Sequence, residues 1–180
     1  MNKIMKLTLV LFLVCAVTAG ILGAVNNLTK DRIADINRQK EEAAFAVVLD
    51  ADGYSAVNFD ATDFPAVKEI YEADSGKGWV VKSSFSGAQG IITMVTGVSP
   101  DYECTGISII SHSETSGLGA NAASSSEIGQ NFRAQFIGQN NSIALAKSGG
   151  EIDALTGATI TSKSVTNAVR QSILACESLG

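Results

Sequence analysis

The chain has 180 residues, which is enough for one domain of ordinary size and an appendage. It carries 18 acidic and 13 basic side chains and a formal net charge of −5 at pH 7, so it has no basic footprint for nucleic acid. A single histidine, His112, excludes a metal site built from several histidines, and the three cysteines form neither a zinc pattern nor a Cys-x-x-Cys motif.

The N-terminal segment, residues 1–26, contains an apolar run from Leu7 to Val25. As a helix this run would extend roughly 28 Å, close to the thickness of a bilayer core. A signal peptide cleaved after Ala19 is the alternative, but the apolar run continues beyond that position, which favours a retained transmembrane helix. Lysines and arginines lie on both sides of the run, so the positive-inside rule leaves the topology open.

Residues 27–50 are predicted to form one juxtamembrane helix that Asn27 or Thr29 begins as an N-cap. An intermittent apolar stripe is expected to dock on the following domain; it consists of Ile33, Ile36, Ala43, Ala44, Val47 and Val48. The turn residues Asp50–Gly53 end the helix. The remaining residues, 51–180, are predicted to form a single domain.

The middle of the chain alternates between short strand-like runs and turn residues. The predicted strands cover residues 66–73, 79–85, 91–98 and 104–111. Short runs linked by hairpin turns favour an antiparallel arrangement over parallel βαβ units. The sequence therefore predicts an α+β fold, an antiparallel sheet or half-barrel with flanking helices, preceded by one N-terminal transmembrane helix.

Three further features follow the predicted sheet. A helix is expected from Glu127, with Ile128, Phe132 and Phe136 spaced for core packing. Residues 143–146 are predicted to form a short strand. Cys104 and Cys176 are open to two interpretations, a disulfide or two buried thiols.

The most informative stretch is Asp153–Ser162, a hydroxyl-rich turn followed by an amphipathic helix. Ser162 is predicted to cap that helix, which would place Thr156, Gly157, Ala158 and Thr159 over its N-terminus. Open backbone N–H groups and the helix dipole make this position suitable for a phosphate, and Gly157 allows close backbone approach. An ordinary helix-entry turn would also contain Ser, Thr and Gly.

The longer pattern Asp-x-x-Thr-Gly-Ala-Thr followed by Ile-Thr-Ser, at residues 153–162, resembles the flavinylation motif of the covalent FMN-binding domain family. This family includes the G subunit of the Rnf electron-transport complex and the C subunit of the sodium-pumping NADH:quinone reductase. The resemblance implies that Thr159 carries covalent FMN through a phosphoester bond formed by a dedicated flavin transferase. It implies that Thr156, Gly157 and Ala158 help to hold the cofactor, and that Asp153 stabilises the turn or aids recognition by the transferase.

A second stretch, from Glu114 to Gly119, resembles the Glu-Thr-Pro-Gly-Leu-Gly signature of the same family, with serine at position 116 in place of proline. Gly117 and Gly119 allow the backbone to lie flat against a planar ring, and Leu118 offers an apolar contact between them. Glu114 and Thr115 are expected to anchor the loop or to meet polar edges of a flavin.

Together these stretches predict an electron-relay subunit rather than a complete enzyme, without catalytic residues of its own. The resemblance implies FMN as cofactor, other Rnf-type membrane subunits as partners, and a single-pass plasma-membrane protein with an extracytoplasmic domain. Two alternatives are a stand-alone flavinylated carrier and, from a different class, a pilin-like or solute-binding anchored protein without flavin. The chain lacks the processing site, with a glutamate inside the apolar segment, that a pilin would have.

Overall fold

The computed structural model describes residues 3–179, so the first two residues of the predicted anchor lie outside the described part. The chain divides into two compact units, Met1–Gln39 and Lys40–Gly180. Helix α1, Lys3–Val48, contributes to both units. Each unit is described by itself.

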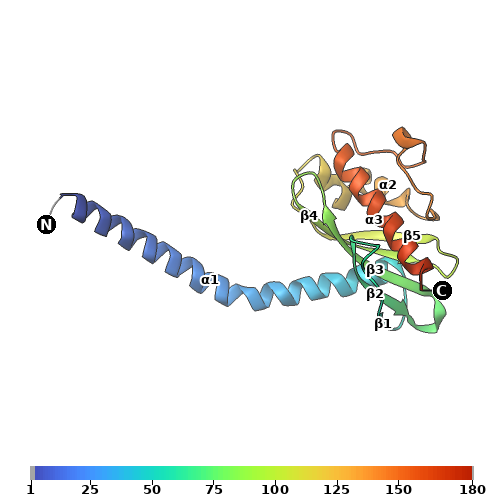
Figure 1. Cartoon of the computed structure of the whole chain (residues 1–180), viewed down its shortest axis with the longest axis horizontal. Coiled ribbons are helices and arrows are strands. Elements are labelled where there is room, and N and C mark those ends of the chain that lie inside the picture. The colour runs from blue at the N-terminus through green and yellow to red at the C-terminus, as the bar shows by residue number, and fades with distance from the viewer. Residues whose placement is uncertain (1–2, 180) are drawn as a thin grey trace. The chain divides into compact units, whose positions relative to one another are not determined.

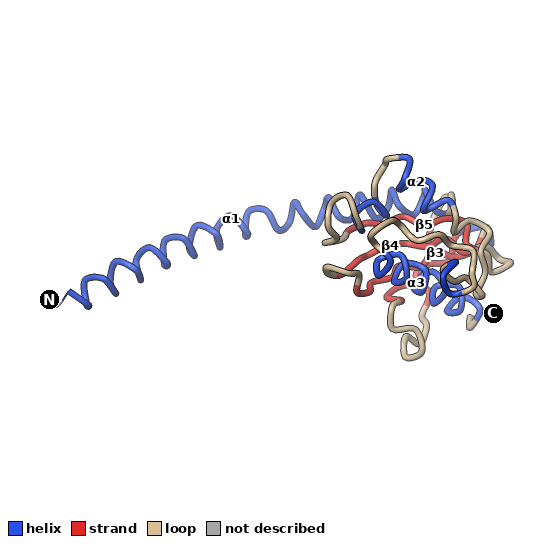
Figure 2. The backbone as a smooth tube through the Cα atoms, turned by 90° about the horizontal axis from the view of Figure 1, so that it is seen from above, coloured by secondary structure: helices blue, strands red, loops and turns tan. Residues whose placement is uncertain are grey.

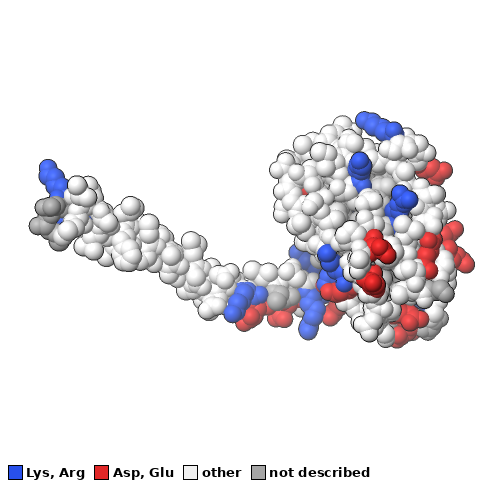
Figure 3. Space-filling view, in the orientation of Figure 1, with Lys and Arg blue, Asp and Glu red and all other residues white. Residues whose placement is uncertain are grey.

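The first unit contains the apolar part of α1. An 18-residue window of this helix has a mean hydropathy of 2.5, so the helix is long and apolar enough to cross a membrane. Figure 3 shows a predominantly uncharged stretch between charged side chains near its start and those that follow residue 29. The prediction of a separate cap at Asn27 or Thr29 is wrong. The Thr29 hydroxyl donates to the Val25 carbonyl at 2.9 Å, inside an uninterrupted helix that no proline breaks.

The second unit contains a five-stranded antiparallel sheet in the order β1-β2-β3-β4-β5 (Figure 1). Its strands are β1 Tyr54–Val57, β2 Val67–Ala73, β3 Gly78–Ser86, β4 Ile91–Val98 and β5 Cys104–Ser111. The sheet is open, and with its helices it confirms the predicted α+β class. Four strands match the predicted runs. The sequence did not predict β1, because this strand has only four residues and none is fully buried.

Helix α3, Thr159–Glu177, packs across one face of the sheet (Figure 2). The residues that recur at helical spacing along this helix are all buried: Val165, Ala168, Val169, Ser172, Ile173 and Cys176. The apolar members of this set share one core with Val67, Ile70, Val81 and Met94 from the sheet. The same core therefore fixes the first turn of α3 relative to the strands.

The end of α1 covers the other face of the sheet. Ala44, Phe45 and Val48 form a second core with Val80 and Val95, which alternate along their strands with residues of the first core. Strands β3 and β4 are thus buried on both faces, which explains their nearly continuous apolar runs.

A glycine allows the end of α1 to approach the sheet closely. A Cβ at Gly97 would lie 2.5 Å from the Val48 carbonyl oxygen and would clash with the Thr105 hydroxyl. That hydroxyl donates to the same Val48 oxygen at 2.5 Å. A carbonyl in the last turn of a helix has no partner within the helix, so this bond both satisfies it and fixes the helix end.

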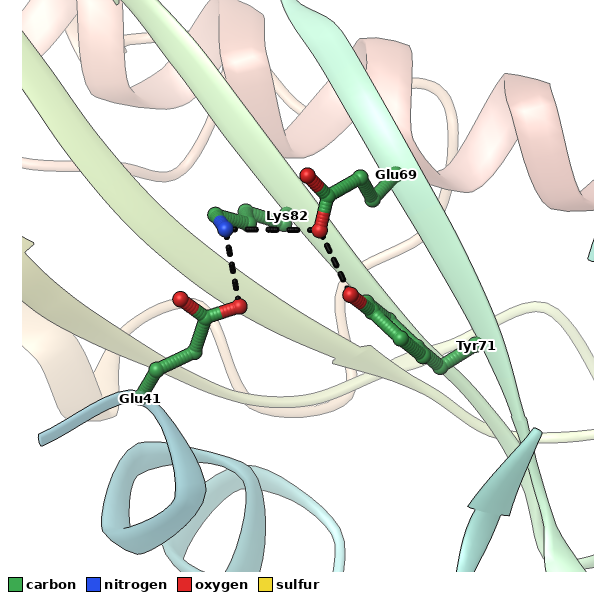
Figure 4. Close-up of polar contacts among 4 residues, drawn as sticks. All are labelled: Glu41, Glu69, Tyr71 and Lys82. Carbon is green, nitrogen blue, oxygen red and sulfur yellow. Dashed lines mark hydrogen bonds and ion pairs between the residues drawn. The ribbon is translucent and has the colours of Figure 1, made fainter. Parts of the chain in front are cut away.

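Polar contacts join the same helix end to the sheet (Figure 4). The Lys82 ammonium lies 2.8 Å from the Glu41 carboxylate and 3.3 Å from that of Glu69, which also accepts from the Tyr71 hydroxyl at 2.5 Å. Burial lowers the pKa of Lys82, but its bonds to Glu41 and Glu69 outweigh burial and the net shift is upward. Burial and the bond to Glu69 raise the pKa of Tyr71. Lys82 therefore remains charged and Tyr71 remains a donor at neutral pH.

Helix α2, Glu127–Ala134, lies where a helix was predicted, but its predicted core is only partly correct. Phe132 and Phe136 are buried and pack edge to face, with ring centroids 5.2 Å apart. Ile128 is 58% exposed, because the buried face of α2 runs through Gly129 and Phe132 and leaves Ile128 outside it. The predicted strand at residues 143–146 is wrong as well: Leu145 makes only an isolated bridge to Ile152.

Cys104 and Cys176 are both free and buried. Burial raises the pKa of each thiol to about 12. Since the thiolate is the reactive form, neither side chain is suited to redox chemistry in the folded protein.

Candidate functional site

The turn before α3 depends on a glycine. Gly157 has φ +73°, in the left-handed region, and a Cβ there would lie 2.9 Å from the Leu118 side chain. The turn closes through the Ala158 N–H, which donates to the Leu155 carbonyl at 3.0 Å. Leu155 and Ala158 are buried, and Thr156 and Gly157 are exposed between them. The backbone therefore presents the Thr-Gly pair to solvent.

The prediction that Ser162 caps α3 is wrong, because the helix begins three residues earlier, at Thr159. Ser162 is fully buried; its hydroxyl accepts from the Leu155 N–H at 3.0 Å and donates to the Ala158 carbonyl at 2.9 Å. The Ser162 hydroxyl therefore accepts from an N–H of the preceding turn and not from an N–H of the first helical turn. Thr159 consequently occupies the first helical position, with its side chain exposed beside the N–H groups that a helix leaves open.

The loop after β5 forms the neighbouring wall. Thr115, Ser116, Gly117 and Leu118 are exposed, and the short 3₁₀ helix η2, Gly119–Ala123, follows them. The Leu118 and Ala120 N–H groups both donate to the Thr115 carbonyl, at 3.1 and 3.2 Å. Leu118 is 43% exposed, so an apolar side chain is held at the surface by a bonded loop.

Glu114 connects three elements at the base of this loop. Its carboxylate accepts from the Thr161 hydroxyl of α3 at 2.5 Å and from the Gln89 N–H of the β3–β4 turn at 3.0 Å. A Cβ at Gly119 or Gly87 would clash with the Glu114 carboxylate oxygens, so both glycines make room for the carboxylate.

The same contacts decide the ionisation of Glu114. Burial raises its pKa, but the hydrogen bonds from Gln89, Thr161 and Ala88 outweigh burial, and the net shift is downward. Glu114 is therefore a buried anion at neutral pH, and it fixes the loop against the first turn of α3.

Two clefts meet at Thr159. The first, of about 310 Å³, is enclosed by the β3–β4 turn, the loop after β5 and the start of α3; it is lined by Ala88, Gln89, Glu114, Thr115, Leu118, Gly119, Gly157, Ala158, Thr159, Ile160 and Thr161. The second, of about 340 Å³, lies along the residues that precede α3; it is lined by Leu145, Ala146, Lys147, Ile152, Asp153, Ala154, Leu155, Thr156, Gly157 and Thr159. Thr159 and Gly157 line both.

The clefts bring nearly all of the predicted site residues together. Glu114, Thr115, Leu118, Gly119 and Ala158 line the first, Asp153 and Thr156 the second. Gly117 lines neither cleft, although its carbonyl accepts from the Asn121 side chain at 3.0 Å and its φ of +77° shapes the loop.

Sequence reasoning missed Lys147, Ile160, Thr161 and the β3–β4 turn residues Ala88 and Gln89. Ile160 and Thr161 lie inside the motif, so adjacency to Thr159 was an available signal. Gln89 contributes its backbone N–H, which no residue type reveals.

This arrangement fits a flavin phosphate. Both volumes lie at the lower end of the usual range for small-molecule sites, roughly 300–1,000 Å³. The open N–H groups at the start of α3 suit a phosphate, and the exposed Leu118 and Ile160 side chains suit an aromatic ring. Thr159 provides an exposed hydroxyl between them.

Replacing Glu114 by alanine is expected to destabilise the domain by roughly 2–4 kcal/mol, because the Thr161 hydroxyl and Gln89 N–H lose their buried acceptor. Glu114→Gln should cost less stability, since an amide oxygen can still accept these hydrogen bonds.

The Glu114 charge also makes stability depend on pH. Because the pKa of Glu114 in the folded protein lies below the ordinary 4.5, its charge stabilises the native state fully above pH 4.5 and less as the pH falls through the folded-state pKa. Urea unfolding as a function of pH should therefore show a loss of stability on acidification that Glu114→Gln reduces; identical curves would contradict this role.

Comparison with known proteins shows which protein families the sequence and the fold resemble. The family model of the FMN-binding domain matches residues 87–174, which include the residues that line both clefts. The family model of the RnfG N-terminal region matches residues 1–48. In solved structures, the C subunit of the Na(+)-translocating NADH-quinone reductase from Parabacteroides distasonis shares the fold, with a TM-score of 0.51 at 20% identity over 75% of this chain and 79% of that one. Residues 87–174 of the second unit thus match the FMN-binding domain.

Relatives that are named as subunits of particular complexes identify the family of this chain. The chain is 33% identical to the G subunit of the proton-translocating ferredoxin:NAD(+) oxidoreductase complex of Clostridium ljungdahlii, over 96% of this chain and 91% of the relative. It is also 33% identical to the G subunit of the Na(+)-translocating complex of Acetobacterium woodii, over 98% and 93%, and 29% identical to the G subunit of the ion-translocating complex of Methanosarcina acetivorans, over 96% and 94%. The chain belongs to the family of G subunits of Rnf-type ion-translocating oxidoreductase complexes.

Proposed function

We propose that this chain is the FMN-carrying electron-transfer subunit of a membrane-bound, ion-translocating ferredoxin:NAD oxidoreductase, with FMN attached to Thr159 by a phosphoester bond. The observation that carries the proposal is the position of Thr159, exposed at the first residue of α3 where two clefts of an FMN-binding domain meet. The names of the relatives support the complex and the other Rnf-type subunits as partners.

Each part of the site has a binding role in this proposal. Leu118 and Ile160 would contact the flavin ring. Gly119 lines the same cleft, and Gly117 shapes the loop that carries Leu118. Gly157, Ala158 and the first N–H groups of α3 hold the phosphate. FMN supplies one- and two-electron chemistry, while the protein retains and orients it.

Attachment places a chemical requirement on the transferase. Forming a phosphoester at the Thr159 hydroxyl oxygen makes one P–O bond and releases the hydroxyl proton to a base. A phosphoanhydride-linked flavin nucleotide supplies the flavin phosphate, and breakage of its P–O–P bond releases the nucleotide leaving group. The exposure of Thr159 supports access by a transferase.

The N-terminal helix is proposed to anchor the protein in the membrane. In this division residues 1–26 cross the membrane, residues 27–50 form the juxtamembrane segment and residues 51–180 the FMN-binding domain, on the extracytoplasmic side. The apolar stretch of α1, which is exposed along its length, supports the anchor. Covalent attachment would prevent loss of FMN from a site open to the cell exterior.

Dependence on a flavin transferase tests the proposal. The full chain, made with the transferase and solubilised in detergent, should gain the mass of one FMN residue and form a fluorescent band on a denaturing gel. Without the transferase it should gain neither. If the transferase modifies a control flavoprotein in the same cells but leaves this chain unmodified, the proposal is wrong. A flavinylated chain that never purifies from its native membrane with other subunits would favour a stand-alone carrier.

A further inference from the structure

The second cleft has a wall that the functional assignment leaves without a role, the turn from Leu145 to Ile152. The Ala146 N–H donates to the Ile152 carbonyl at 2.8 Å, and the Ser148 and Gly150 N–H groups both donate to the Leu145 carbonyl, at 2.8 and 3.0 Å. The side chains of Leu145 and Ile152 are buried. The turn is therefore fixed at both ends.

Two glycines shape the tip of this turn. Gly149 has φ +84°, and a Cβ at Gly150 would clash with the Ala144 carbonyl oxygen. This tight backbone presents Lys147 in the short 3₁₀ helix η3, Ala146–Ser148, with its side chain exposed. Lys147 lines the cleft that ends at Thr159.

The two clefts differ in charge. Of the described residues that line them, Lys147 is the only one with a positive charge. The first cleft contains the Glu114 carboxylate, and the second contains Asp153. Asp153 is exposed, and its backbone is bonded at both N–H and carbonyl to the Gln135 side chain, at 2.7 and 3.4 Å. Solvent therefore screens the Asp153 carboxylate in the second cleft, whereas the buried Glu114 carboxylate in the first cleft is screened less.

We propose, resting on the function proposed above, that the phosphodiester lies where the two clefts meet at Thr159 and that the Lys147 ammonium binds its anionic oxygens from the second cleft. A phosphodiester carries one negative charge at neutral pH. The buried Glu114 anion disfavours that charge farther into the first cleft, where Leu118 and Ile160 suit the uncharged ring. Thr159, which lines both clefts, is the junction between phosphate and ring.

Lys147→Gln tests this assignment, with Lys147→Arg as the conservative variant and Lys68→Gln as the control. Lys68 is an exposed lysine on β2 that lines neither cleft. Each full-length chain is flavinylated by a limiting amount of transferase, and the product is followed by intact mass. Loss of a charge-assisted contact should slow the reaction of Lys147→Gln by about three- to tenfold, while Lys147→Arg and Lys68→Gln should react at nearly the wild-type rate.

The ³¹P NMR resonance of the flavinylated proteins separates a contact within the protein from recognition by the transferase. The phosphodiester resonance should shift in Lys147→Gln and stay at its wild-type position in Lys68→Gln. A slower reaction with an unshifted resonance would mean that Lys147 serves the transferase, and would overturn the proposal. An unchanged rate and resonance would overturn it too. Failure of the wild-type chain to accept FMN would instead refute the proposed function.

Discussion

Thr159→Ala is expected to abolish covalent FMN, whereas Thr156→Ala should retain it. Both threonines are exposed and line the second cleft, but only Thr159 lies at the first position of α3 and lines both clefts. Thr159→Ser keeps a hydroxyl at the same place and should accept FMN at a reduced rate. Intact mass and fluorescence on a denaturing gel, after co-expression with the transferase, measure all three.

The loss of FMN in Thr159→Ala should not reflect unfolding. An exposed side chain at a helix start contributes little to stability, so the variant should unfold within about 0.5–1 kcal/mol of the unmodified wild type. Thr161 is not an alternative acceptor, because it is buried and its hydroxyl is engaged by Glu114. Undiminished flavinylation of Thr159→Ala would contradict the assignment.

A chain that begins at residue 51 is expected to be severely destabilised, whereas one that begins at residue 40 should fold. The shorter chain lacks Phe45 and Val48, which are 7% and 3% exposed, and it uncovers Val80 and Val95 on the sheet. Burial of one such side chain contributes about 1.5–3 kcal/mol, and whole domains are stable by only about 5–15 kcal/mol. The bonds of Val48 to Thr105 and of Glu41 to Lys82 are lost as well.

Thermal unfolding followed by circular dichroism compares the two chains directly. Phe45→Ala in the chain that begins at residue 40 is the matched variant, and it should cost about 3–5 kcal/mol. Equal melting temperatures for both chain lengths would show that the end of α1 is dispensable, contrary to the packing of the second core.

The sequence predicted those features that local patterns encode. The strands from β2 to β5 and the buried face of α3 follow from apolar periodicity and turn residues. The Thr159 motif and the Glu114 loop are contiguous stretches, so their resemblance to the motifs of a known family could be recognised in the sequence. The structure adds the hydrogen bond between Thr161 and Glu114, which are 47 positions apart and whose contact depends on how α3 crosses the sheet.

Other features depend on tertiary structure and were missed for that reason. Ser162 has the chemistry of a cap, but the preceding turn uses its hydroxyl, so the helix begins at Thr159. Ile128 has helical spacing, yet the buried face of its helix runs through Gly129 and Phe132 instead. Lys147 belongs to no motif, and only the turn from Leu145 to Ile152 brings it to the cleft beside Thr159.

The most direct test of the account is to map the flavin on the native protein purified from its own membranes. Cleavage after lysine releases the peptide from Ser148 to Lys163, which contains Thr156, Thr159 and Thr161. Fragmentation in a mass spectrometer should assign one FMN residue to Thr159. An unmodified peptide, or a flavin on any other residue, would contradict the central claim.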